Sequence, residues 1–374
     1  MKKSLLWLLI MLLTVSIVVT FSLAGCKKEE VAEEEVAEEE AVEEEVAEEE
    51  AVEEAETTAL PKDDWVIGLS NSYYGNVWRH QMVESFESAA QMAKDQGLIK
   101  DFEVQNGDNT VPAQIAQLNS FILKEVDAIC INAASPTALN DVIEKAVEEG
   151  IVVVAFDSVV TSPAAYIMDY DWELWGKAMV DYVAERLNGQ GDIILLRGPS
   201  GSAPDIGVNE GEMRELEKYP DLNVVAVVSG EASDVKAQEE LLKILPSLPN
   251  VDAVLTMAAA TGTVNAFEQL NREIPIIIGD NTAEFINWWI EKKKTTGYET
   301  LSICSTPGCG SAAFWVALNI LKKVDVPEKM ILELLTVTQD EVEQYADLKA
   351  GTFVSPVFTN DYVVKHYIEP AMQK

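Results

Sequence analysis

The stretch AVEEGIVVVAFD, residues Ala146–Asp157, contains the pattern that decides the fold. A segment of helical character ends at Gly150, and a continuous apolar run, Ile151–Phe156, follows it. Strands that are buried on both faces of a parallel sheet carry continuous apolar runs of this kind. A carboxylate, Asp157, comes directly after the run. The stretch therefore predicts a helix followed by a buried strand, with a polar side chain at the carboxyl end of that strand.

The same unit recurs along the chain from Asp64 onward. Short apolar runs that we interpret as strands alternate with amphipathic segments of helical length. We expect strands at 65–70, 102–106, 127–132, 151–157, 192–197, 223–229, 252–257, 275–280 and 300–305, and helices at 112–125, 137–149, 173–188, 234–245 and 262–272. This alternation predicts an α/β fold with mainly parallel sheets covered by helices on both faces. The number of these strand–helix units is larger than a single sheet usually holds, so we expect two lobes.

The N-terminus carries a targeting pattern. Lys2 and Lys3 precede an apolar run from Leu5 to Phe21, and Leu23–Cys26 reads LAGC. Small residues before a cleavage site are typical of a signal peptide, and LAGC resembles the bacterial lipoprotein box. We therefore expect residues 1–25 to be a signal peptide and Cys26 to carry the lipid that anchors the protein to the cell membrane. The alternative is a transmembrane anchor, because the apolar run approaches spanning length.

The segment 26–63 is strongly acidic and repeats VAEEE and AVEEE with a period of five. Seventeen glutamates lie between Lys27 and Lys62. Neighbouring glutamates repel one another, and too little apolar surface is present to offset the lost chain entropy. We interpret the segment as a disordered or partly helical charged tether. An acidic tail that binds a metal ion or a basic partner is the alternative.

Charge and motif content exclude several classes of function. Much of the formal net charge of -37 belongs to the tether, and the remainder is moderately acidic, which argues against nucleic acid as a partner. The chain has no phosphate-loop or dinucleotide-binding motif and no His/Cys spacing typical of zinc, so we expect no cofactor and no metal. Cys304 and Cys309 are close enough in sequence for a disulfide, but spacing does not establish the required geometry.

Polar residues follow most of the expected strands. In open parallel sheets, ligands bind outside the carboxyl ends of the strands. Carboxylate and amide groups bond pairs of hydroxyls, and aromatic rings cover the apolar C–H face of a polyhydroxyl ligand. The alternative is that these residues only cap helices and form turns. The candidate ligand-binding residues at strand exits are Ser72, Tyr73, Asn76, Trp78, Arg79, Asp108, Ser135, Asp157, Ser158, Asp280, Asn281 and Ser305.

The succession of these motifs resembles the type I periplasmic binding proteins, specifically the ribose-binding-like sugar receptors of ABC importers. The similarity spans about residues 64–340, and the order of the motifs is more specific than any one of them. It is carried by Asp108–Asn119, Val126–Leu139, Ala146–Asp157 and Ile277–Asp280. The resemblance implies two Rossmann-like lobes with parallel sheets, a hinge of three crossings, and a ligand cleft between the lobes. Hinge closure around a ligand is the mechanism known for this class of protein.

The resemblance also implies roles for single residues. Ser72, Asn76 and Trp78 fall on first-lobe positions that grip and stack on the sugar. Asp157 falls on the first-lobe carboxylate that bonds hydroxyls, and Asp280 falls on its second-lobe counterpart. Ser305 lies where the family often has a hinge-region amide.

The expected crossings divide the folded part into lobes. We expect them near Met168–Asp171, Cys304–Thr306 and Glu333–Thr336. The first lobe then comprises 64–168 and 306–334, and the second comprises 169–305 and 335–374.

The sequence departs from the family pattern at arginines. Ser158 stands where many members have an arginine, and the second-lobe loop Ser202–Gly211 contains none, so Asp205 and Asn209 are the candidates to replace it. Arg79 stands at a position where members of the family often have an aromatic residue. Arg79 either bonds ligand hydroxyls or a ligand carboxylate, or it forms a salt bridge to a neighbouring acid.

These observations predict a binding protein and not an enzyme. We expect a monomeric, lipid-anchored extracytoplasmic receptor that captures a sugar, polyol or related small molecule by lobe closure and delivers it to an ABC permease. The alternative is a ligand-sensing subunit, for a sugar or a quorum signal, of a membrane signalling receptor.

Overall fold

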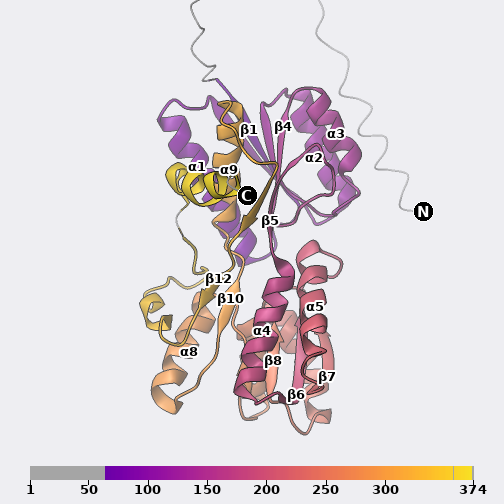
Figure 1. Cartoon of the computed structure of the whole chain (residues 1–374), viewed down its shortest axis with the longest axis vertical. Helices are drawn as coiled ribbons and strands as arrows, with labels where there is room; N and C mark the ends of the chain where they lie inside the picture. The colour runs from indigo at the N-terminus through magenta and orange to yellow at the C-terminus, as the bar shows by residue number, and fades with distance from the viewer. Residues whose placement is uncertain (1–63, 357, 373–374) are drawn as a thin grey trace, which may run out of the picture. The chain divides into compact units, whose positions relative to one another are not determined.

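The computed structural model describes residues 64–356 and 358–372. The expected signal peptide, the lipidation site Cys26 and the acidic tether lie outside the described residues. Two parallel sheets form the centres of two lobes, in agreement with the α/β prediction (Figure 1). None of the helices in the described ranges is both long and apolar enough to cross a membrane.

The first lobe is built on a six-stranded sheet of order β11-β5-β4-β3-β1-β2, in which all neighbouring strands are parallel. Its strands are β1 (Val66–Asn71), β2 (Asp101–Asn106), β3 (Ala128–Asn132), β4 (Val152–Phe156), β5 (Tyr166–Tyr170) and β11 (Lys329–Leu332). The apolar run Ile151–Phe156 forms β4, and four of the five residues of β4 are buried because neighbouring strands and helices cover them. The sequence patterns missed β5 and β11.

Helices cover both faces of this sheet. On one face, α1 (Val77–Asp95) and α9 (Cys309–Leu321) pack against each other and share one apolar core with β1 and β4 (Figure 1). On the other face, α2 (Val111–Leu123) and α3 (Asn140–Glu148) bury a second core. The sheet is therefore shielded from water on both sides, which explains the nearly continuous apolar runs of its central strands β3 and β4.

The second lobe has a four-stranded parallel sheet of order β7-β6-β8-β9. Its strands are β6 (Gln190–Arg197), β7 (Asp221–Ser229), β8 (Ala253–Thr256) and β9 (Ile276–Ile277). One face packs on α4 (Trp172–Arg186) and α5 (Ala203–Leu216), and the other packs on α6 (Asp234–Ile244), α7 (Ala260–Gln269) and α8 (Ala283–Thr296). Short 3₁₀ turns lie at Leu245–Ser247 and Val342–Tyr345.

The chain passes between the lobes near the three expected places. β5 ends at Tyr170 and α4 begins at Trp172, while β10 (Ser302–Cys304) leads to α9. The third passage lies between β11 and β12 (Leu335–Val337), and β12 pairs antiparallel with β10. The division of the chain at particular residues stays a prediction.

The C-terminal segment does not remain with the second lobe, in contrast to the expectation that 335–374 belongs to it. Up to Val354 the chain bonds to second-lobe residues, but it then returns to the first lobe. Phe358 lies against Gly308 at the start of α9, and the amide of Asn319 donates to Asn360. The last turns, α10 (Asn360–Val363), a π-helical turn (Val364–Ile368) and α11 (Glu369–Met372), follow. Their apolar side chains are buried against α9 and β11, which accounts for the return.

Candidate functional site

Neighbouring strands of the first-lobe sheet end in polar residues at one edge. Asn71 at the end of β1 is in register with Asn132 at the end of β3, and Asp157 follows β4. Asn132 donates from Nδ2 to Oδ2 of Asp157 at 3.0 Å. Within the described ranges, Oδ1 of Asn71 and Oδ1 of Asn132 are buried without a hydrogen-bond partner. Two unused acceptors therefore lie at the sheet edge where ligands of such folds bind.

The first turn of α1 brings an aromatic ring and a cation to this edge. Asn76 caps the helix, since its Oδ1 accepts from the backbone N–H of Arg79 at 2.9 Å. The indole N–H of Trp78 donates to the backbone carbonyl of Ser305 at 3.1 Å. The capping oxygen of Asn76 and the indole nitrogen of Trp78 thus position the turn relative to the second crossing. Trp78 is 9% exposed.

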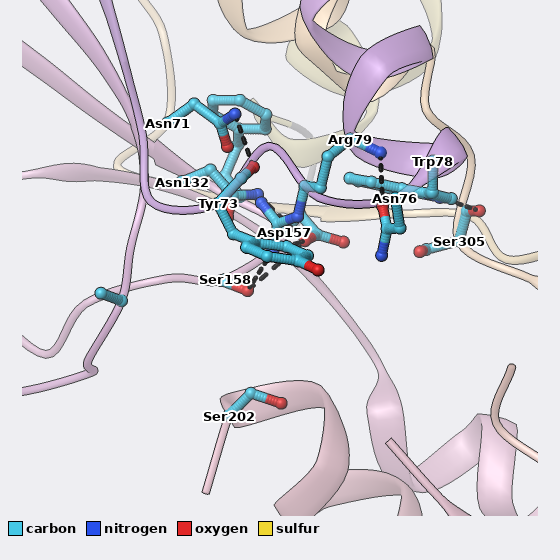
Figure 2. Close-up of polar contacts among 12 residues, drawn as sticks. Asn71, Tyr73, Asn76, Trp78, Arg79, Asn132, Asp157, Ser158, Ser202 and Ser305 are labelled. Atoms are coloured by element: carbon cyan, nitrogen blue, oxygen red, sulfur yellow. Dashed lines mark hydrogen bonds and ion pairs between the residues drawn. The ribbon is translucent and has the colours of Figure 1, made fainter. Parts of the chain in front are cut away.

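Arg79 lies over the carboxylate that follows β4. Its Nη2 is 3.4 Å from Oγ of Ser158 and 3.8 Å from Oδ2 of Asp157, and its guanidinium carbon is 5.3 Å from the centre of the Trp78 ring. Figure 2 shows the residues together. The salt bridge to a neighbouring acid, one of the two alternatives that the sequence leaves open for Arg79, is therefore present. Nη1 of Arg79 is buried and has no partner among the described residues, so one donor of the guanidinium is unused.

Burial dominates the electrostatics of this pair. The side chains of Arg79 and Asp157 are 15% and 6% exposed. Loss of hydration lowers the pKa of Arg79 and raises the pKa of Asp157, and the attraction between the two charges opposes both shifts. Hydrogen bonds from Asn132, Ser305 and Ser158 further oppose the rise in the pKa of Asp157. Asp157 itself has a left-handed backbone, with φ of 57°.

The ring of Tyr73 lies beside the same group. A Cβ atom added to Gly75 would lie 2.1 Å from the Tyr73 hydroxyl oxygen, so the glycine makes room for the ring. Figure 2 shows the ring next to Asp157 and Ser158. Of the residues that the sequence predicts for the site, the structure brings together Tyr73, Trp78, Arg79, Asp157, Ser158 and Ser305.

An arginine that sequence reasoning missed lies at the end of a second-lobe strand. Arg197, the last residue of β6, donates from Nε to Oδ1 of Asp205 at 2.8 Å and from Nη1 to Oδ1 of Asn209 at 2.8 Å. The predicted residues Asp205 and Asn209 thus hold a cation whose side chain is 25% exposed. The arginine that the family pattern places in the loop after β6 stands instead at the end of the strand, where the only sequence signal is a charged residue directly after the apolar run Ile193–Leu196.

A buried acid lies one helical turn after Asn209. Glu212 on α5 is 2% exposed, and its Oε2 has no partner within the described part of the chain. Loss of hydration raises the pKa of Glu212 to about 8, although the positive charge of Arg197 opposes the rise. Glu212 is therefore protonated in the folded protein at neutral pH.

The predicted carboxylate Asp280 caps a helix. Its Oδ2 accepts from the backbone N–H of Ala260 at 3.0 Å at the start of α7, and its Oδ1 accepts from the Thr282 hydroxyl at 2.8 Å. Asp234 accepts from Gly262 in the same turn, and burial together with the charge of Asp280 raises the pKa of Asp234 to about 6. Two carboxylates therefore share one helix terminus, where the helix dipole favours negative charge.

The remaining predicted residues make local contacts. Asn281 donates from Nδ2 to the Leu335 carbonyl at 2.7 Å. Ser72 is buried and bonds through its backbone to Asn132 and Asn109. Asp108 is exposed and accepts from Thr110 at the start of α2, and Ser135 accepts from Ala138 in the turn before α3. The turn-and-cap alternative therefore describes the contacts of Asp108 and Ser135.

Cysteines and acidic residues in the described ranges form no disulfide and no metal cluster. Cys130, Cys304 and Cys309 are free thiols, and all three are buried. No group of three or more His, Cys, Asp or Glu side chains in these ranges is arranged to hold a metal ion.

Comparison with known proteins agrees with this arrangement. The signature of the periplasmic binding protein domain matches residues 67–324. The chain belongs to this family. It is a family of binding proteins, without enzymatic activity, which agrees with the prediction that the chain is not an enzyme.

Relatives place the chain among solute-binding proteins. A solved ABC transporter solute binding protein from Thermobispora bispora is 32% identical, with a TM-score of 0.78 over 83% of this chain and 96% of that one. The xylitol-binding protein of Mycolicibacterium smegmatis is 31% identical over 122 residues, and the D-xylose-binding periplasmic protein of Escherichia coli is 28% identical over 130 residues. This chain spans 35% and 38% of the length of those two relatives.

Proposed function

We propose that the chain is the extracytoplasmic solute-binding protein of an ABC importer, that a lipid on Cys26 anchors it to the membrane, and that it captures a sugar or polyol. The observation that carries the proposal is the group formed by Arg79, Asp157 and Ser158 beside two aromatic rings at the carboxyl edge of the first-lobe sheet. The similarity to solute-binding proteins supports the same role.

The chemistry of this group suits an uncharged polyhydroxyl ligand. The charge of Arg79 is balanced by Asp157, so the group does not need a charged ligand to neutralise it. A hydroxyl both donates and accepts, which matches the unused donor Nη1 of Arg79 and the unused Oδ1 acceptor of Asn132. The rings of Tyr73 and Trp78 supply apolar surface for C–H groups. Relatives named for xylitol and D-xylose support a five-carbon polyol or sugar as the first ligands to test.

Closure of the lobes would add a second set of contacts. Arg197 and Asn281 are the second-lobe candidates, because Arg197 is partly exposed at a strand end and Oδ1 of Asn281 has no partner in the described ranges. A ligand that touches both lobes stabilises the closed state by its difference in affinity for the closed and open states. The ligand would then be presented to the permease without covalent chemistry.

The test is a titration of the purified protein with xylitol, D-xylose, myo-inositol and the charged D-xylonate, followed by calorimetry and by thermal unfolding. A bound ligand raises the unfolding midpoint by mass action. We expect a neutral member to bind and D-xylonate to bind more weakly. Replacement of Asp157 by asparagine should abolish binding and leave a folded protein. The carbohydrate assignment fails if none of the neutral compounds binds, and the site assignment fails if Asp157→Asn binds like the wild type.

Lipid anchoring is tested separately. In a bacterial host fed a labelled fatty acid, we expect label on the wild-type protein and none on Cys26→Ser. Labelling of the serine variant, or an unlabelled wild type, would contradict the anchor. Copurification with a permease rather than with a membrane kinase would support transport over sensing.

A further inference from the structure

A short segment near the end of the chain contacts both lobes. We name residues Gly351–Ser355 the strap. It lies between the part of the chain that packs on α8 and the part that returns to α9. Ser355 accepts from the backbone N–H of Gly308 at 3.0 Å, so the strap is fixed at its end to the crossing that precedes α9.

The strap pairs with the loop that carries Asp280 and Asn281. The backbone N–H of Val354 donates to the carbonyl of Asn281 at 2.8 Å, and that of Ala283 donates to the carbonyl of Thr352 at 2.8 Å. These two bonds flank an antiparallel bridge between Thr282 and Phe353. In such a pair the peptide groups of the residue between the two bonds point away from the partner strand. The N–H and C=O of Phe353 therefore face the other side.

A side chain of α1 occupies that other side. Oε1 of Gln81 accepts from the N–H of Phe353 at 2.7 Å, and its Nε2 donates to the Phe353 carbonyl at 3.3 Å. The glutamine amide thus completes the backbone hydrogen bonding of Phe353, as a neighbouring strand would. Gln81 lies in the same helical turns as Trp78 and Arg79, the residues that α1 contributes to the candidate site.

We propose that Gln81 is a positioning residue: through the strap, it fixes the second-lobe loop at Asp280–Asn281 relative to the first-lobe group around Arg79, and it thereby sets ligand affinity without touching the ligand. The connection is continuous and short. It runs from the Gln81 side chain to the Phe353 backbone, and from the adjacent Val354 to the carbonyl of Asn281. A site made from two lobes binds tightly when its halves are held in register before the ligand arrives, because less ordering remains for binding to supply.

The effect on affinity rests on the proposed function, so the first measurement needs no ligand. Gln81→Met keeps the length of the side chain and removes both bonds. Gln91→Met is the matched control on the same helix, because the Gln91 amide bonds only to Asp95 on the exposed surface. Hydrogen exchange is measured at Ala283 and Val354, whose N–H groups are bonded to Thr352 and Asn281 and not to Gln81. We expect faster exchange at both in Gln81→Met and wild-type exchange in Gln91→Met. Unchanged exchange at both amides would overturn the coupling.

The second measurement is the affinity for xylitol, or for D-xylose if the wild type prefers it. We expect Gln81→Met to bind about five-fold more weakly, the lower end of typical coupling between sites. Gln81→Glu keeps the acceptor for the Phe353 N–H, so it should recover part of the loss. The ranking of ligands should not change. A lower unfolding midpoint with wild-type affinity would show that Gln81 only supports the fold. If the wild type binds none of the neutral compounds, the proposed function fails, and the exchange data alone decide the coupling.

Discussion

Removing the buried cation beside Asp157 should destabilise the protein far more than removing an exposed one. Arg79→Met leaves the Asp157 carboxylate without its counter-charge, in a position where the two side chains are only 15% and 6% exposed. At a separation of 3.8 Å, two unit charges interact by about 4 kcal/mol at an effective dielectric constant of about 20. Because burying both charges costs free energy, the intact pair stabilises the fold only weakly. Removing one partner is strongly destabilising, since the other charge stays buried without compensation.

Protonation of Asp157 limits the loss in the free energy of unfolding that Arg79→Met causes. If Asp157 takes up a proton when Arg79 is removed, the cost at pH 7 is about 4 kcal/mol relative to its ordinary pKa of 3.8, and less because burial already raises this pKa. The bond from Asn132 also remains. We therefore expect Arg79→Met to lower the free energy of unfolding by about 2–4 kcal/mol.

A double-mutant cycle in urea at pH 7 measures the coupling directly. The variants are Arg79→Met, Asp157→Asn and the double replacement. In the double variant, Asp157→Asn should lower the free energy of unfolding little beyond the loss that Arg79→Met causes. This gives a coupling energy of about 2–3 kcal/mol. Arg186→Met is the matched control, because its partner Glu299 is 49% exposed, and it should cost less than about 1 kcal/mol. Additive effects of Arg79→Met and Asp157→Asn, within about 0.5 kcal/mol, would refute the reasoning.

Other substitutions test the remaining parts of the site. Because burial raises the pKa of Glu212 to about 8 from 4.5, the folded protein retains a proton that the unfolded chain releases, and the free energy of unfolding falls as pH rises between these values. Glu212→Gln should flatten this decline, by at most about 4 kcal/mol, in urea unfolding at pH 5 and pH 8, whereas Glu210→Gln should leave it unchanged. Gly75→Ala must displace the ring of Tyr73 and should weaken xylitol binding several-fold in calorimetry, with little change in the unfolding midpoint; unchanged binding would exclude a role for the ring. Trp78→Phe leaves a buried carbonyl unpaired and should cost about 1–3 kcal/mol in the same urea assay; no loss would mean that the bond is unimportant.

The sequence by itself determined the class of fold and much of the first-lobe site. Continuous apolar runs at regular intervals identify buried parallel strands, and parallel strands end at a common edge, so residues such as Asp157 and Ser158 can be placed near Trp78 without coordinates. The sequence patterns missed β5 and β11 because neither strand is a continuous buried apolar run: β5 contains Asp169, and β11 alternates exposed and buried residues.

Only the tertiary structure decided how polar atoms divide between folding and binding. Asp280 caps α7, Asp205 and Asn209 hold Arg197, and Oδ1 of Asn132 has no hydrogen-bond partner in the part of the chain that the structure describes. Gln81 contacts a peptide 272 residues away. A sequence reveals which residue types follow a strand because that pattern is local. It does not reveal hydrogen-bond partners that meet only after the chain folds, since each donor and acceptor can be satisfied in several ways and three-dimensional packing selects one of them.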